Sequence, residues 1–168
     1  MLANLFKSRD LSKLGKIFLF AVLLSNMAFS QNAGFGSLAS DRTEPIEFNS
    51  DRLIFNQGEN LAELFDEVKI IQGKTVLSAD YVKAFYSQTN KLEKVFAERN
   101  IELKSEQDIA RADTAIYSLT ENSISLIGNA RLIQGANNIM ADQILINTET
   151  GLTQLLGSVK TVISPSTN

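Results

Sequence analysis

The chain has 168 residues, with 19 acidic and 16 basic residues and with no Cys, His or Trp. Without His and Cys, Ser-His and Cys-His catalysis and nearly all zinc and copper sites are excluded. The net charge of −3, without a basic cluster, argues against nucleic acid as a partner, because phosphate neutralisation supplies most of that affinity. The length is typical of one domain, for which we expect no metal site and no cofactor.

Residues 1–30 have the features of a secretory signal peptide in the right order. Four basic residues precede an apolar run at 17–24, and Ala28 and Ser30 are small residues at the positions that a signal peptidase reads. We therefore predict cleavage before Gln31. The alternative is an uncleaved membrane anchor, which needs about 20 apolar residues. Only 14 uncharged residues separate the last basic residue from Gln31, so cleavage is favoured.

Cleavage would leave 138 residues, with 12 basic and 18 acidic side chains and a net charge of −6. With no Cys, a packed core must hold this domain together without disulfides. Residues 31–44 are small, polar and Gly-rich, which predicts a flexible lead-in. Two prolines bracket residues 45–165, and since proline is excluded from paired central strands, we expect one continuous sheet there. Residues 166–168 are expected to form a short tail.

Between the prolines, the sequence has the pattern of an all-β protein. Short alternating segments rich in Val, Ile, Leu, Phe and Thr are separated by turn-forming residues. Residues 60–68 also suit a short helix by composition, but their place in a repeat favours a strand. The predicted turns lie at residues 56–60, 72–74, 87–91, 134–138 and 147–151.

An internal repeat of about 30 residues organises this region. Residues 65–83 align with residues 127–145 at a constant offset of 62, without a gap. The period is long enough for two strands of about ten residues with their turns. Aspartates recur once per unit, at Asp51, Asp80, Asp113 and Asp142, and turn-like positions recur at Asp66, Arg99, Gly128 and Gly157.

The alternation of apolar residues shows where the faces of the strands lie. In one strand of each unit, the apolar residues keep the same parity on both sides of the turn-like position. In the other strand the parity flips at the aspartate, as with Leu77 before Asp80 and Val82 after it. Because a period of two forbids such a flip unless a residue is inserted, we predict a β-bulge or sharp bend at each aspartate.

We interpret these aspartates as structural residues. At a bulge, an aspartate can accept hydrogen bonds from the backbone N–H groups that the bulge frees. A calcium ladder is the alternative, but calcium needs six to eight oxygens in a tight loop. Each unit offers one carboxylate beside Ala or Ser, so we predict no metal there.

The repeated units resemble the OstA-like repeat of the LptA family, periplasmic proteins of lipopolysaccharide export. The resemblance is carried by GNARLIQG…ADQI at 128–144, DEVKIIQG…ADYV at 66–82 and GSVKTVI at 157–163. It extends from about residue 45 to residue 165. No single motif is specific to the family. The recurrence of these motifs in this order, behind a signal peptide, is specific. Two units replace the turn glycine, and the last replaces the following asparagine with Ser158.

The resemblance implies a fold and a function. The implied fold is a twisted, open β-jelly roll built from two-strand repeats, with an apolar interior that holds the acyl chains of lipopolysaccharide. Protomers would associate head to tail through their terminal strands in the periplasm, forming a bridge between the two membranes. The implied partners are an inner-membrane LptC-like and an outer-membrane LptD-like jelly roll.

The residues themselves support part of this expectation. The inward positions carry almost no charge and many alanines, so the walls of the sheet should leave room for a lipid. The terminal strands should be free to pair with another chain, and Ile46, Phe48, Leu53, Val159 and Val162 mark them. The candidate lipid-contacting residues are Val68, Ile70, Leu77, Ile101, Leu103, Leu126, Leu132, Ile139 and Ile144.

Three alternatives remain open on the sequence. The chain could be the membrane-anchored LptC-like partner, in which case residues 17–30 would be retained as an anchor. It could be a structural secreted β-repeat protein without lipid cargo. The third alternative is a carboxylate-based glycosidase, which needs two acids at close range in a cleft. Charged residues on strands more often form a solvated face, so we predict no enzyme, although the candidate acids would be Glu47, Asp51, Glu63 and Asp66.

Overall fold

The structure is a computed structural model that describes residues 35–106 and 108–163. The chain divides into two units, Met1–Gln31 and Asn32–Asn168, and every described residue belongs to the second. The predicted signal peptide and the predicted tail at 166–168 lie outside the described residues. Among the helices that can be described, none is long and apolar enough to cross a membrane.

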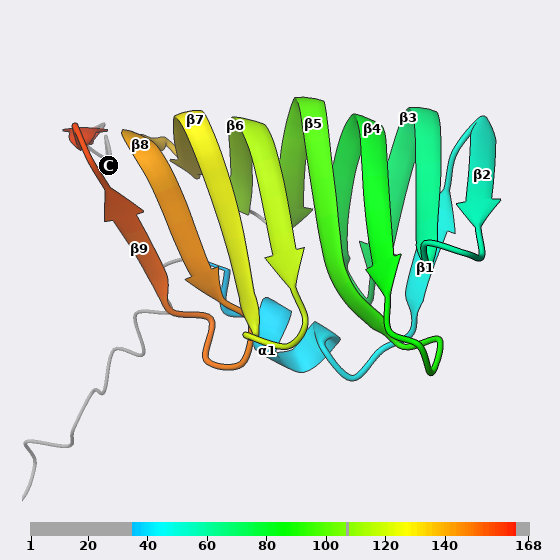
Figure 1. Ribbon diagram of the computed structural model, residues 1–168. Helices are drawn as coiled ribbons and strands as arrows, with labels where there is room; N and C mark the ends of the chain where they lie inside the picture. The colour runs from blue at the N-terminus through cyan, green and yellow to red at the C-terminus, as the bar shows by residue number, and fades with distance from the viewer. Residues whose placement is uncertain (1–34, 107, 164–168) are drawn as a thin grey trace, which may run out of the picture. The chain divides into compact units, whose positions relative to one another are not determined.

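The described residues form one antiparallel sheet of ten strands, with a single-turn helix, α1 (Leu38–Asp41), before the first strand (Figure 1). The order is β1-β3-β4-β5-β6-β7-β8-β10, with β2 also paired to β3 and β9 to β8. The predicted all-β fold is therefore confirmed, including a strand where a helix was the alternative. The strands are β1 Ile46–Asn49, β2 Arg52–Asn56, β3 Leu61–Gln72, β4 Thr75–Tyr86, β5 Leu92–Ser105, β6 Asp108–Ser118, β7 Ser123–Gln134, β8 Asn137–Asn147, β9 Thr153–Leu156 and β10 Lys160–Val162.

The sheet bends across all its strands at one level. Between β3 and β4, Phe65 pairs with Tyr81 and Val68 with Ala79, which leaves two residues of β3 opposite Asp80 alone. An equivalent shift recurs in each pairing from β4 to β8. We call this line of register shifts the bent edge. At the same level, β1 is separated from β2, and β9 from β10.

The bend folds the sheet into two facing layers (Figure 1). Alternate residues of both layers point into one buried apolar cluster, so the space between the layers is the core. The first layer consists of β1, β10 and residues 68–79, 101–112 and 130–141. The second layer consists of β2, β9 and residues 61–65, 81–98, 114–127 and 143–147.

The predicted bulges occur at the expected level but on the neighbouring strand. In β4, Leu77, Ala79, Val82 and Ala84 are buried, so the parity flip at Asp80 is confirmed. The extra residue, however, belongs to β3, β5 and β7, where two successive residues have positive φ. Placing the bulge on the aspartate strand was therefore wrong, because the left-handed backbone that makes the bulge lies at the turn-like position. These residue pairs are Asp66–Glu67, Arg99–Asn100 and Gly128–Asn129.

The aspartates join neighbouring strands along the bent edge. The side-chain amides of Asn100 and Asn129 donate to Asp80 (2.7 Å) and Asp113 (2.8 Å), and the Ser158 hydroxyl donates to Asp142 (3.2 Å). The predicted acceptor role is confirmed, but the donor is a side chain rather than a freed backbone N–H. Asn100 and Asn129 belong to the next strand, and Ser158 lies between β9 and β10.

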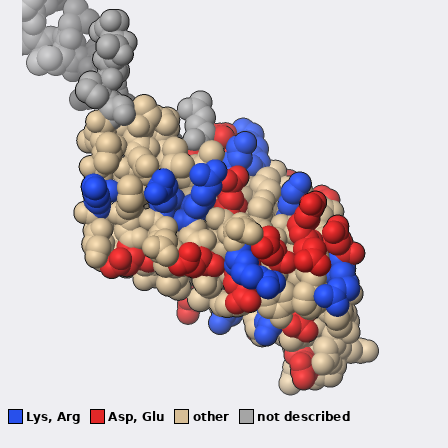
Figure 2. Space-filling model, turned by 90° about the horizontal axis from the view of Figure 1, so that it is seen from above, with Lys and Arg blue, Asp and Glu red and all other residues tan. Residues whose placement is uncertain are grey.

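Glycine is required at one of these bends for two reasons. Gly128 has φ +81°, and an added Cβ would lie 2.5 Å from Asp113 Oδ2. The aspartate therefore fills the space that the missing side chain leaves. Exposed charged side chains of both signs follow the bent edge, which Figure 2 views from above.

Candidate functional site

The predicted lipid-contacting residues all lie on the inner faces of the two layers. Eight of the nine are buried, and Ile139 is partly buried against the same apolar cluster. In the first layer, five of them occupy one row across the sheet, since Ile70 pairs with Leu77, Leu77 with Leu103, and Leu132 with Ile139. Val68 and Ile101 lie on the same face, two residues nearer the bent edge. Ala110 joins the two halves of this row, because it pairs with both Leu103 and Leu132.

A second row crosses the facing layer in the same way. Its members are paired from strand to strand without a gap, and the row reaches both ends of the sheet. The predicted site residues Leu126 and Ile144 lie in this row. In order across the sheet, the row is Leu53, Leu64, Val82, Ala97, Ala115, Leu126, Ile144 and Leu155. The two layers thus present continuous apolar tracks that run perpendicular to the strands.

The space between the layers is filled. The cavity between them measures about 30 Å³, whereas ligand pockets occupy about 300–1,000 Å³. It is lined by Ile70 and Leu103 of the first layer, by Ile124 of the second and by Leu38 of α1. The small inward side chains bring the layers together instead of leaving the open slot that the sequence predicted.

Residues 35–44 close the side of the fold opposite the bent edge. We call this side the mouth and these residues the strap. The mouth is where the hairpin turns of the two layers face each other, and α1 lies between them (Figure 1). Phe35 and Leu38 are 0% and 4% exposed and belong to the same buried cluster as the tracks. Part of the segment that we expected to be a flexible lead-in thus packs against the core.

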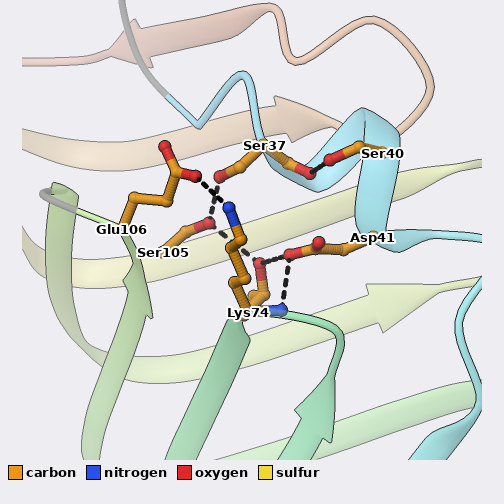
Figure 3. A network of polar contacts seen from close by, with 7 residues as sticks. Ser37, Ser40, Asp41, Lys74, Ser105 and Glu106 are labelled. Atoms are coloured by element: carbon orange, nitrogen blue, oxygen red, sulfur yellow. Dashed lines mark hydrogen bonds and ion pairs between the residues drawn. The ribbon is translucent and has the colours of Figure 1, made fainter.

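The strap is attached to the first layer by a buried polar network (Figure 3). Asp41 is buried, and its Oδ2 accepts hydrogen bonds from the backbone N–H of Lys74 (3.1 Å) and the hydroxyl of Thr75 (2.8 Å). The Thr75 hydroxyl also lies 2.9 Å from that of Ser105, which contacts the hydroxyl of Ser37. Each buried polar group of this network has a partner, as burial requires.

A lysine next to this network is exposed to solvent. The Lys74 ammonium pairs with Glu106 at 2.9 Å, and this hydrogen bond and charge raise the pKa of Lys74. The carboxylate of Asp41 acts in the same direction. The positively charged Lys74 side chain is therefore close to the site where the Asp41 carboxylate is bound.

The strap also contacts the second layer. An added Cβ on Gly151 would lie 2.8 Å from the Cα of Gly36, so the two backbones are in close contact. Arg42 forms an exposed ion pair with Glu149 at 2.9 Å. The strap thus bridges the ends of both layers.

One direct hydrogen bond also crosses the mouth. The Tyr117 hydroxyl of the second layer donates to the side-chain oxygen of Gln72 in the first, at 3.2 Å. Burial raises the pKa of Tyr117. The amide nitrogen of Gln72 in turn donates to the backbone oxygens of Arg42 (3.0 Å) and Glu44 (3.1 Å), which couples this bond to the strap.

The ends of the sheet lie where the sequence predicted. Ile46 and Phe48 of β1 are partly buried against the core, whereas Leu53 of β2 is 55% exposed and Val162 of β10 is 47% exposed. Val159 is also exposed, but it precedes β10, so its assignment to an edge strand was wrong by one residue. Further exposed apolar residues at the two ends are Ile54, Phe55, Leu156 and Ile163.

One of the candidate catalytic acids, Glu63, faces away from the space between the layers. Glu63 accepts a hydrogen bond from the Tyr81 hydroxyl on the outer face of the second layer. Burial, together with this bond, raises the pKa of Tyr81 to about 12. Over the described ranges, no group of three or more Asp, Glu, His or Cys side chains could hold a metal ion.

Comparison with known proteins identifies the family. A family model described as LptA/(LptD N-terminal domain) LPS transport protein matches residues 47–152. The chain belongs to this family. The family is described as one of lipopolysaccharide transport proteins. The resemblance stated for the repeats is thereby confirmed.

Individual relatives of this LptA-family chain agree with that result. Lipopolysaccharide export system protein LptH of Pseudomonas aeruginosa is 28% identical over 135 residues, covering 73% of this chain and 77% of LptH. An uncharacterized protein of Rhizobium meliloti (strain 1021) is 26% identical over 146 residues, covering 80% of this chain and 78% of the relative.

A solved structure supports the fold. The crystal structure of LptH, described as the LptA homologous periplasmic component of the lipopolysaccharide transport device of Pseudomonas aeruginosa, superimposes with a TM-score of 0.67. It shares 22% sequence identity and covers 75% of this chain and 99% of LptH. The predicted open jelly roll is thus confirmed for the domain.

Proposed function

We propose that this LptA-family chain carries lipopolysaccharide through the periplasm with the acyl chains held between its two layers. The observation that supports this proposal is the pair of continuous apolar tracks on the inner faces. A lipid that moves along the fold needs a series of similar apolar contacts, and the tracks supply them.

The exposed ends of the sheet suit transfer to a neighbouring jelly roll. Each terminal strand pairs with one described neighbour, so its other side carries backbone groups that a further strand can use. The second-layer track begins at the exposed Leu53, so head-to-tail pairing would join it to a partner's track. The partners we propose are a second copy, an LptC-like domain at the inner membrane and an LptD-like domain at the outer membrane.

We also propose that residues 1–30 are a cleaved signal peptide and that the domain extends over 45–165, followed by the tail at 166–168. The mass of the protein purified from the periplasm tests the first point. A mass that begins at Gln31 fits the transport role, and a retained segment at 17–30 would instead fit the membrane-anchored LptC-like alternative.

A structural β-repeat protein without cargo is the second candidate. The observation that favours it is the filled interior, with a cavity of about 30 Å³ between the layers. This candidate predicts that the folded protein retains no lipid at any concentration that can be tested.

The two candidates are separated by two neighbouring residues of β8. Ile139 faces the inner track, whereas Met140 is on the opposite face of the same strand, and both are partly exposed. We expect Ile139→Asp to weaken retention of lipopolysaccharide at least about tenfold, since a charge would have to enter the apolar contact. Met140→Asp should retain it like the original protein.

Retention is measured by co-purification and by equilibrium binding on variants whose circular dichroism spectrum and thermal transition show that they are folded. Equal retention by folded Ile139→Asp would contradict the inner-face site. Light scattering over a range of concentrations tests the ends of the sheet, and a mass that stays monomeric throughout would contradict head-to-tail pairing.

A further inference from the structure

We propose that the strap, residues 35–44, is an internal substitute for the lipid. Its apolar side chains occupy the place of an acyl chain at the mouth, and its buried carboxylate occupies a site for an anionic group of the same amphiphile. The strap and the cargo would then exclude each other, so loading requires the strap to leave. This inference rests on the proposed function.

The apolar half of the strap contacts the surface that the lipid would use. Leu38 lines the cavity together with Leu77 and Leu103, which belong to the first-layer track. Phe35 is fully buried in the same cluster. An acyl chain that contacts the track at the mouth therefore cannot bind while these side chains remain in place.

The polar half of the strap marks an anion site at the rim of the mouth. Asp41 accepts hydrogen bonds from the backbone N–H of Lys74 and the hydroxyl of Thr75, and the hydroxyl of Ser105 is next to that of Thr75. If the strap leaves, these three donors face the opening, with the Lys74 ammonium beside them (Figure 3). Donors of this kind suit a phosphate oxygen as well as a carboxylate.

The position of these donors selects the class of ligand. Thr75 is two residues from Leu77 on β4, and Ser105 is two residues from Leu103 on β5, so each hydroxyl is on the same face as a track residue. An anion held by the hydroxyls therefore sits directly above the apolar track. A phosphorylated acyl lipid has this arrangement of groups, and a neutral acyl lipid does not.

The strap is also the part of the domain that can detach most easily. Its helix is one turn long, too short to be stable alone, and Ser37 makes no side-chain cap bond at its N-terminus. The Arg42–Glu149 pair is exposed, where ion pairs contribute little. No β-ladder joins the strap to the sheet in the described residues. It can leave without breaking any strand pairing.

A reversible lock tests the exclusion. The chain has no Cys, so Ser37→Cys with Ser105→Cys creates one possible disulfide, at two side chains that are in contact. We expect the oxidised protein to retain phosphorylated lipid A at least tenfold less than the same protein after reduction. The single variant Ser37→Cys cannot form the bond and should not respond to oxidation.

The outcomes separate this inference from the proposed function. Equal retention before and after reduction, with the disulfide confirmed by mass, would overturn the inference and leave the lipid site intact. If the unmodified chain retains no lipid A at all, the proposed function fails and the inference with it.

A loosened strap tests the anion site without a disulfide. Leu38→Ser combined with Asp41→Asn removes an apolar contact and the buried charge, so retention of phosphorylated lipid A should rise about tenfold. This variant should prefer phosphorylated lipid A over the dephosphorylated form at least fivefold. Equal binding of the two forms would overturn the anion site, and unchanged or weaker retention of both would overturn the exclusion.

Discussion

The two long sides of the domain join its layers in different ways. At the bent edge, six continuous strands pass from one layer to the other, and three aspartates accept hydrogen bonds from side chains of the following segment of the chain. At the mouth, the layers end in separate hairpin turns, and they meet through the strap and the bond between Tyr117 and Gln72. The layers are therefore held together along the bent edge, which can act as a hinge, and they can separate at the mouth.

The difference explains how a filled core can belong to a carrier. Separating the layers at the bent edge would break backbone pairing in several strands at once. Separating them at the mouth exposes apolar surface but breaks no strand pairing, and an entering acyl chain would cover that surface again. We expect substitutions at the bent edge to act on stability and substitutions at the mouth to act on loading.

The largest expected effect is at a glycine of the bent edge. Gly128→Ala places a Cβ 2.5 Å from the Asp113 carboxylate in a left-handed conformation, and should lower the free energy of unfolding by about 3 kcal/mol. The control is Gly135→Ala at the mouth, where φ is +58° but nothing lies within 4 Å of an added Cβ. That variant should lose about 1 kcal/mol.

Urea unfolding measures both variants. A loss at Gly128 no larger than the loss at Gly135 would show that the packing of aspartate against glycine does not secure the bend.

The aspartates themselves should have a smaller effect. Asp113→Ala removes the acceptor of the exposed Asn129 amide, and should cost about 0.5–1.5 kcal/mol. The control is Asp51→Ala, since Asp51 lies opposite Asp66 and Glu67, neither of which offers a side-chain donor when ionised. Its loss should be below about 0.5 kcal/mol. Equal losses in thermal unfolding would contradict the assigned hydrogen bonds.

The smallest expected effect on stability is at the mouth. Arg42→Ala removes an exposed ion pair with Glu149, and should change the free energy of unfolding by less than about 0.5 kcal/mol. Hydrogen exchange should nevertheless accelerate for the strap amides and not for those of β5 and β7, since local opening does not require the sheet to unfold. Unchanged exchange of the strap would show that the ion pair does not hold it.

Much of the sheet can be predicted from the sequence because each strand carries its own periodicity. The alternation placed Val82 and Leu126 on the inner face, and the repeat placed a bend near each aspartate. The strand that holds the extra residue could not be assigned. The alternation within one strand shows which of its residues face inward, but not how that strand is paired with its neighbour. The left-handed conformation of Arg99, a residue that seldom adopts it, also has no local signal.

The strap could not be predicted, for a different physical reason. Residues 31–44 contain two large apolar side chains, Phe35 and Leu38, too few to establish a period among small and polar residues. Their burial depends on residues far away in sequence: Leu38 lines the cavity with Thr75, and Gly151 lies against the backbone of Phe35.

The central claim, that acyl chains bind between the layers, is tested most directly at two neighbouring residues of β7. A photocrosslinking amino acid is placed at Leu132, which is buried on the inner track, and in a separate variant at Arg131, which is exposed on the opposite face. Lipopolysaccharide adducts are then measured in living cells. We predict adducts at Leu132 and none above background at Arg131, whereas equal labelling at both positions would contradict the claim.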